Sequence, residues 1–213
     1  MNSNKSISLV ALIVMTIVSF SNLVGLNIAG LSVIVGITFF FIHRKFDKRD
    51  SDGLDIKVIR TYVKQKTIWL WIALPLVMNI ICFTLAALFL PEFIDHIHSR
   101  TEFVISFDKL VLLVLQLAVL ALGEEIAWRA FFQKQLSKYI PIIPTIILTS
   151  IIFSLGHFAV GSAVIVSYDI FFIFINSVIY GVIFYKTNNA WISTISHYIA
   201  NVFSILLVTA FVF

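Results

Sequence analysis

The chain has 213 residues, of which 60% are hydrophobic and only 12% are charged, and its formal net charge is +4. This apolar share is far above that of soluble globular domains, so the composition excludes a soluble enzyme and indicates an integral membrane protein. The single cysteine, Cys82, excludes an intramolecular disulfide and a zinc site built from cysteines.

Apolar stretches of helix length follow one another along the whole chain. We therefore expect an all-α fold, a polytopic membrane helix bundle of about seven transmembrane helices that forms a single domain over residues 1–213. The expected spans cover residues 7–24, 26–42, 67–90, 109–136, 143–165, 168–186 and 190–212. Neither an internal repeat nor a Gly/Ser-rich linker divides the sequence.

The first two spans form one apolar run from Ile7 to Ile42. This run is too long for the core of a cleaved signal peptide, and it has the length of two closely connected helices. Asn22, Gly25 and Asn27 mark the position at which we expect the chain to turn.

The segment after the second span is the most basic part of the sequence. Its basic residues are Arg44, Lys45, Lys48, Arg49, Lys57, Arg60, Lys64 and Lys66. The positive-inside rule places the N-terminus and the 43–66 loop on the cytoplasmic side, and then only Arg100 and Lys109 fall outside. Lysine and arginine beside a membrane attract anionic headgroups, so membrane lipids are expected partners and nucleic acid is not.

The fourth span contains the sequence Glu124-Glu125-Ile126-Ala127-Trp128-Arg129. Each ionisable side chain near the centre of a bilayer costs about 2.5 to 3.5 kcal/mol, so these three require compensation. On an α-helix Glu125 and Arg129 share a face and can pair, whereas Glu124 points about 100° away. Glu124 is therefore the carboxylate that remains available for chemistry.

Two later spans bring imidazoles into the membrane. The fifth contains Phe153 and His157, and the seventh contains His197 and Asn201, which are four residues apart and share a face. If these side chains converge with Glu124, a carboxylate and imidazoles can deprotonate a water that attacks a peptide carbonyl, and the asparagine amide can donate to the oxyanion. Alternatively, Glu124, His157 and His197 can ligate Zn²⁺ or another divalent metal.

The three motifs Glu-Glu-x-x-x-Arg, Phe-x-x-x-His and His-x-x-x-Asn occur in this order on successive expected helices. In this respect the chain resembles the CPBP intramembrane proteases, the family of CAAX prenyl endopeptidases and of bacterial Abi and bacteriocin-processing or immunity proteins. The resemblance covers about residues 109 to 205. Residues 109–213 would form the catalytic helix core, and residues 1–108 would form variable N-terminal helices and the basic loop.

The resemblance also implies a role for each motif residue. Glu124 would activate water with the help of His157, Glu125 would support the site, and Arg129 would pair with a carboxylate. His197 and Asn201 would stabilise the oxyanion or ligate the metal, and Phe153 would pack beside His157. Two mechanisms have been considered for this family: a metalloprotease reaction and a metal-free reaction in which a glutamate activates the water. The sequence leaves both mechanisms open.

Other intramembrane protease designs do not fit the sequence. It contains no His-Glu-x-x-His motif and no Gly-x-Ser-Gly motif, and Asp169 lacks the second aspartate of an aspartyl enzyme. Together with the resemblance, this favours an intramembrane endopeptidase acting on a small membrane-associated or lipidated peptide or protein. Abundant Ile, Phe, Asn and Lys suggest an AT-rich bacterium, which favours bacteriocin or signal-peptide processing, or self-immunity, over a prenylated CAAX substrate. The alternative is a non-proteolytic immunity factor or regulator that binds a toxin, transporter or sensor kinase through its helices.

Overall fold

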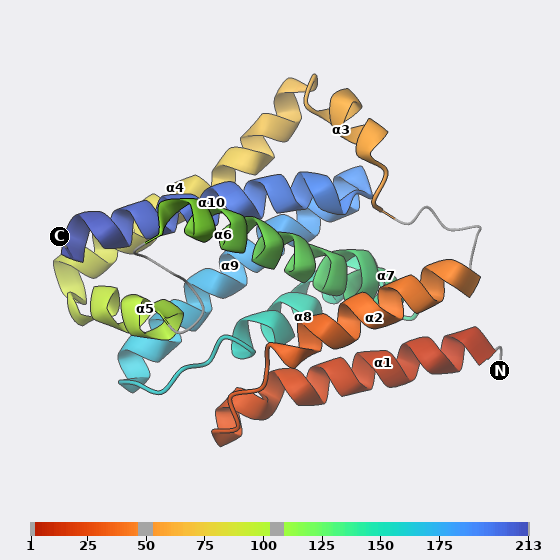
Figure 1. Ribbon diagram of the computed structural model, residues 1–213, viewed down its shortest axis with the longest axis horizontal. Coiled ribbons are helices and arrows are strands. Elements are labelled where there is room, and N and C mark those ends of the chain that lie inside the picture. Colours follow the sequence, from red (N-terminus) through yellow and green to blue (C-terminus); the bar gives the residue numbers. More distant parts are fainter. Residues whose placement is uncertain (1–2, 47–52, 103–108, 213) are drawn as a thin grey trace.

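The computed structural model describes residues 3–46, 53–102 and 109–212, and this part of the chain contains helices but no strand. In chain order (Figure 1) its helices are α1 (Ser3–Ser19), the 3₁₀ turn η1 (Phe20–Val24), α2 (Leu31–Phe46), α3 (Ile56–Tyr62), α4 (Lys66–Phe89), α5 (Glu92–Glu102), α6 (Leu110–Glu124), the π-helix η2 (Glu125–Gln133), α7 (Lys134–Leu136), α8 (Ile142–Leu155), α9 (Ala163–Thr187) and α10 (Ala190–Val212). The predicted polytopic helix bundle is therefore confirmed.

Helix length and hydropathy give different numbers of membrane spans. Among the described residues, five helical stretches are long and apolar enough to cross a membrane: Ser6–Val24, Lys66–Phe89, Val111–Leu136, Ala163–Thr187 and Ala190–Ala210. The other two expected spans correspond to α2, with 16 residues, and α8, with 14 residues. Because 14 residues of α-helix extend only about 21 Å, α8 is shorter than a bilayer core, and the count of seven spans stays a prediction.

The helices α1 and α2 form a hairpin along one side of the bundle (Figure 1). The predicted turn is present: Gly25 and Asn27 have φ angles of +78° and +52°, in the left-handed region that glycine and asparagine tolerate best. The hairpin packs against η2 at Gly36, where an added Cβ would lie 2.6 Å from the Ala127 Cβ. Only a glycine permits this close approach.

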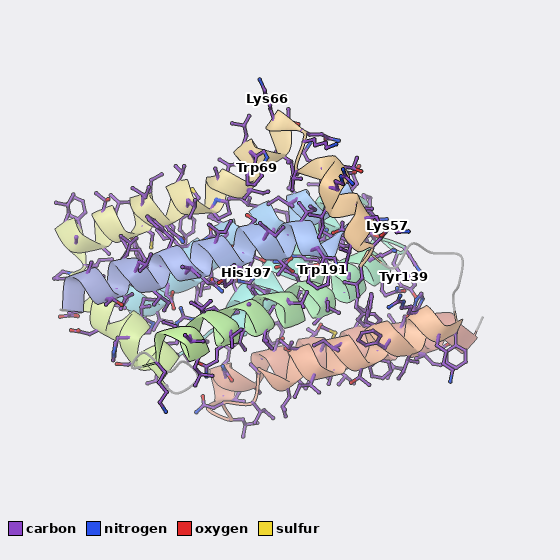
Figure 2. All side chains as sticks on the ribbon, turned by 45° about the horizontal axis from the view of Figure 1, so that its top comes forward. Lys57, Lys66, Trp69, Tyr139, Trp191 and His197 are labelled. Carbon is purple, nitrogen blue, oxygen red and sulfur yellow. The ribbon has the colours of Figure 1, made fainter. Side chains whose placement is uncertain are left out.

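The segment before α4 is attached to the turn between α9 and α10. Ala190 donates its N–H to the Gly53 carbonyl at 2.7 Å, and the Trp191 indole donates to the Leu54 carbonyl at 3.0 Å. Figure 2 shows Lys66 and Trp69 at the tip of this end of the molecule, whereas His197 lies deeper in the bundle. Lys48 and Arg49 of the predicted basic loop lie outside the described residues.

A polar network joins α4 to the helices of the C-terminal half. The Asn79 amide donates to the Ala200 carbonyl at 3.0 Å and to the Ser204 hydroxyl at 2.8 Å, and its own oxygen accepts from Asn176 at 3.0 Å. Such buried amide bonds fix how neighbouring helices slide and rotate within an apolar bundle. The network therefore sets the position of α10, which carries His197 and Asn201.

Candidate active site

The two glutamates lie where the backbone changes its helical form. The helix predicted over 109–136 is present as one helical stretch, but its form changes within it: α6 ends at Glu124, and the nine residues from Glu125 to Gln133 form a π-helix with wider turns. All nine π-helical residues are buried. Stretches of π-helix are rare in proteins, and those that occur are often located at functional sites, where the wider turn changes the direction of side chains.

Glu125 is completely enclosed. Its side chain has no exposed surface, its Oε2 lies 3.6 Å from Arg129 Nε, and its Oε1 lies 3.0 Å from His197 Nδ1. Arg129 is equally buried and donates through its other side to the Ser177 hydroxyl at 3.1 Å and the Ser177 carbonyl at 3.3 Å. The pairing of Glu125 with Arg129 that the sequence spacing predicts is thus present, with His197 as an additional partner.

Glu124 has a different environment although it is the next residue. Its side chain keeps 20% of its surface exposed, and its Oε2 lies 3.6 Å from His197 Nε2, which is too long for a hydrogen bond. Of the two carboxylates, only Glu124 can therefore be approached by water or by a bound peptide. The expectation that Glu124 is the more available carboxylate agrees with this geometry.

His197 lies between the two glutamates and connects them. A carboxylate can only accept, so the 3.0 Å contact with Glu125 requires a proton on Nδ1 and leaves Nε2 directed at Glu124. The Tyr180 ring stacks on the imidazole at 4.4 Å with an interplanar angle of 17°.

His157 does not lie inside a helix, contrary to the predicted span at 143–165. Helix α8 ends at Leu155, and His157 belongs to the turn that follows Gly156. The His157 Nδ1 lies 2.9 Å from the Phe153 carbonyl, which can only accept, so Nδ1 carries the proton and Nε2 is the free nitrogen of the neutral ring. The Glu124 carboxylate is close enough to act on His157 electrostatically.

Phe153 contacts more of the cluster than a packing residue beside His157 would. Its ring centroid lies 4.6 Å from that of His157 and 6.4 Å from that of His197. The Arg129 guanidinium lies over the same ring, with 5.1 Å from its central carbon to the ring centroid. Phe153 is therefore the apolar centre around which the charged side chains are arranged, and it attracts Arg129 through its π face.

Asn201 lies one helical turn after His197 on α10, in a partly buried position. Within the described part of the chain, no hydrogen bond engages its side-chain amide. Both N–H donors of the amide are therefore available for a bound group. Asn201 is connected to the glutamate cluster through α10, which also carries His197.

The donors proposed for a metal do not form a metal site. Among the described residues, no group of three or more His, Cys, Asp or Glu side chains is arranged to hold a metal ion. His197 directs its Nδ1 to Glu125, and His157 directs its Nδ1 to a backbone carbonyl, so the Nε2 of each ring is oriented as in metal-binding histidines, but these nitrogens and the Glu124 carboxylate are not grouped around one point. Glu124, His157 and His197 do not fit Zn²⁺ in this arrangement.

A second polar cluster lies beside the first. The segment 91–108, expected as an external polar loop, contains the helix α5, which buries Phe93 and packs against α9 and α10. Its Arg100 Nε lies 3.0 Å from Asp169 Oδ2, and its His96 Nε2 lies 3.4 Å from the same oxygen. Asp169, which stands alone in the sequence, is therefore paired across helices with His96 and Arg100.

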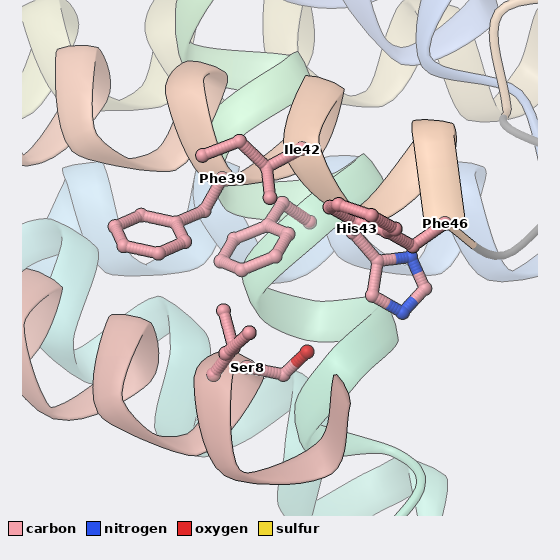
Figure 3. Close-up of a pocket in the computed structure, with 7 residues that line it drawn as sticks. Ser8, Phe39, Ile42, His43 and Phe46 are labelled. Atoms are coloured by element: carbon pink, nitrogen blue, oxygen red, sulfur yellow. The ribbon is translucent and has the colours of Figure 1, made fainter. Parts of the chain in front are cut away.

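A pocket between α1 and α2 is separate from the glutamate cluster (Figure 3). It is lined mainly by apolar side chains near the open end of the hairpin, namely Ile7, Ser8, Phe39, Ile42, His43, Phe46 and Phe131. Because none of the predicted catalytic side chains lines it, this pocket is not the place where the predicted chemistry would occur.

The sequence was compared with known proteins. Residues 106–203 match the family model described as type II CAAX prenyl endopeptidase, Rce1-like. Over these residues the chain is similar to the Rce1-like family. All three recognised motifs fall within the matched residues, and the resemblance to the CPBP intramembrane proteases is confirmed. No curated protein and no solved structure matches the chain.

The matched segment 106–203 contains two site residues that sequence reasoning missed. Tyr180 stacks on His197, and Ser177 accepts from the Arg129 guanidinium through its hydroxyl and its backbone carbonyl. Both lie on one face of α9, three residues apart. This spacing of polar groups in a membrane span was the available signal.

Proposed function

We propose that this protein is an intramembrane endopeptidase in which Glu124 activates the attacking water. The main support is the difference between the two glutamates, because Glu125 is fully enclosed by Arg129 and His197 whereas Glu124 keeps 20% of its side chain exposed. The match to a protease family supports peptide hydrolysis as the reaction.

In the proposed reaction, Glu124 takes a proton from water as the water oxygen attacks the carbonyl carbon of the scissile peptide bond. The resulting tetrahedral oxyanion collapses, the C–N bond breaks, and the proton passes to the leaving amine. The Nε2 of His157 is the free base that assists the proton transfer, because its Nδ1 proton is held by the Phe153 carbonyl.

His197 and Asn201 stabilise the negative charge in this proposal. Glu125 orients the His197 imidazole through Nδ1 and thereby fixes the direction of Nε2, as buried carboxylates do for histidines in other catalytic sites. The Asn201 amide supplies a neutral N–H donor to the oxyanion. No step passes through a metal, because the donors do not fit one.

The proposed substrate is a small membrane-associated or lipidated peptide that is cleaved near the cytoplasmic face. The family is named for prenylated CAAX substrates. For this chain, whose composition suggests a bacterium, we propose a bacteriocin leader or a signal-peptide precursor as the natural substrate. A site surrounded by apolar helices suits a peptide that reaches it from the lipid phase.

The experiment uses the full chain reconstituted in liposomes and an internally quenched peptide that carries a farnesylated CAAX sequence. Two further peptides of the same sequence, one with a palmitoyl anchor and one without any lipid, show which anchor cleavage requires. Glu124→Gln should lower kcat by about 10² to 10⁴, the usual contribution of general base catalysis. Glu92→Gln makes the same charge change at an exposed carboxylate and should leave kcat unchanged.

Two results would count against the proposal. If Glu124→Gln cleaves the lipidated peptides as fast as the wild type, Glu124 does not activate the water. If the folded wild-type protein cleaves none of the three peptides, but still confers immunity or regulation in cells, the non-proteolytic scaffold function is favoured.

A further inference from the structure

A residue of the N-terminal hairpin forms hydrogen bonds with the turn that carries His157. The Asn22 side-chain amide donates to the Gly156 carbonyl at 3.1 Å and to the Phe158 carbonyl at 3.3 Å. These two carbonyls lie immediately before and after His157. One side chain thus ties the backbone on both sides of a single histidine.

The other backbone groups of this turn are already paired within α8. Gly156 donates its N–H to the Ile152 carbonyl, His157 to that of Ser154, and Phe158 to that of Leu155, at 2.9 to 3.1 Å. The Gly156 and Phe158 carbonyls lie beyond the end of the helix and cannot be paired in this way. Asn22 supplies the donors that the helix end itself lacks.

The orientation of Asn22 is itself fixed. Its Oδ1 accepts from the backbone N–H of Ala29 at 3.2 Å, so the amide nitrogen must face the His157 turn. Asn22 belongs to η1, between α1 and α2, and the α2 helix of the same hairpin touches η2 at Gly36. The hairpin therefore contacts both the glutamate segment and the histidine turn.

We propose that Asn22 is a positioning residue for His157, and that the N-terminal hairpin is a functional part of the catalytic site although it lies outside the matched residues 106–203. The inference rests on the proposed function in so far as His157 assists catalysis. Asn22 acts by fixing the backbone at residues 156–158 and hence the direction of the His157 ring. It does not itself contact the reacting groups.

Two measurements test this role. The first is the split between kcat and KM on the farnesylated peptide. The second is the rate at which diethyl pyrocarbonate modifies His157, followed by peptide mass spectrometry, which needs no peptidase activity. Asn22→Asp keeps the size and the acceptor for Ala29 but replaces the donor with a group that repels both carbonyls. Thr16→Val removes a half-buried side-chain hydrogen bond elsewhere in the hairpin and is the matched control.

Asn22→Asp should lower kcat by about tenfold to a hundredfold with little change in KM, because a displaced catalytic group loses its near-attack geometry. The modification rate of His157 should rise in Asn22→Asp and stay at the wild-type value in Thr16→Val. Asn22→Gln, which retains the amide, should recover part of the lost kcat.

An Asn22→Asp protein with wild-type kcat and wild-type His157 reactivity would overturn the proposal. If Asn22→Asp does not fold, Asn22→Ser, which keeps a single donor, is measured in the same way with the same expected direction. A protein without peptidase activity would contradict the proposed function, whereas unchanged reactivity of His157 would contradict only the positioning role of Asn22.

Discussion

The half of the chain that matches the protease family buries charged side chains, whereas the N-terminal half buries only apolar and neutral polar ones among its described residues. Glu125, Arg129 and Asp169 are all buried in the C-terminal half. The N-terminal half contributes Asn22 and Asn79, whose amides bind backbone carbonyls of the other half. The charged side chains proposed for catalysis are thus concentrated in the C-terminal half, whereas both halves contribute contacts around them.

The largest effect is expected at the buried ion pair of the C-terminal half. Glu125→Ala leaves Arg129 charged and uncompensated in an apolar interior, which should cost about 3 to 5 kcal/mol of stability. Denaturant unfolding in detergent micelles, with Glu92→Ala as the exposed control, measures this loss. The double variant Glu125→Leu/Arg129→Leu should recover most of the stability but no peptidase activity, and a double variant as unstable as Glu125→Ala would contradict the pairing.

A smaller effect is expected where the N-terminal half touches η2. Gly36→Val places a side chain within 2.6 Å of the Ala127 Cβ and 2.8 Å of the Met15 Cε. Such overpacking should cost about 1 to 3 kcal/mol and should lower peptidase activity by moving the glutamate segment. Gly30→Val is the matched control, since nothing lies within 4 Å of a Cβ at Gly30. Equal stability and activity of the two variants would show that the hairpin merely covers the catalytic half.

The stacking of Tyr180 on His197 should make a still smaller contribution. Tyr180→Leu removes a ring that lies 4.4 Å from the imidazole and should cost about 0.5 to 1.5 kcal/mol, together with part of kcat. Tyr180→Phe keeps the ring and should retain wild-type kcat. If Tyr180→Phe is as impaired as Tyr180→Leu, the hydroxyl group and not the stacked ring is what matters.

The smallest effect is expected from metal removal. Incubation of the reconstituted protein with 1,10-phenanthroline and EDTA, followed by the quenched-peptide assay, should leave kcat unchanged. The reason is that the Glu124, His157 and His197 side chains do not form a metal-ligand group. Loss of turnover that Zn²⁺ restores would show that these side chains rearrange around a metal, and would contradict the metal-free reaction.

Much of the C-terminal half could be predicted because the signals in its sequence are local. Burying a charge in a membrane is costly, so Glu125 and Arg129 at a spacing of four predict an ion pair, and this pair is present. Its geometry was not predictable, since the spacing of the motif gives no sign of the π-helix from Glu125 to Gln133 or of its close packing against α2 at Gly36. Hydropathy also placed His157 within a span, but helix α8 ends at Leu155.

The contacts between distant segments could not be inferred from the sequence. Asn22 and Gly156 are 134 positions apart, and Arg100 and Asp169 are 69 positions apart. The sequence does not indicate which carbonyl a neutral asparagine in a turn will bind. An arginine in a polar segment is expected to be solvated, and only the packing of α5 against the bundle brings Arg100 to Asp169. The sequence by itself determined the membrane class, the protease family and the charged motif residues, because composition and spacing are local properties. Only the tertiary structure decided which side chains meet His157 and His197, because those contacts depend on how whole helices pack.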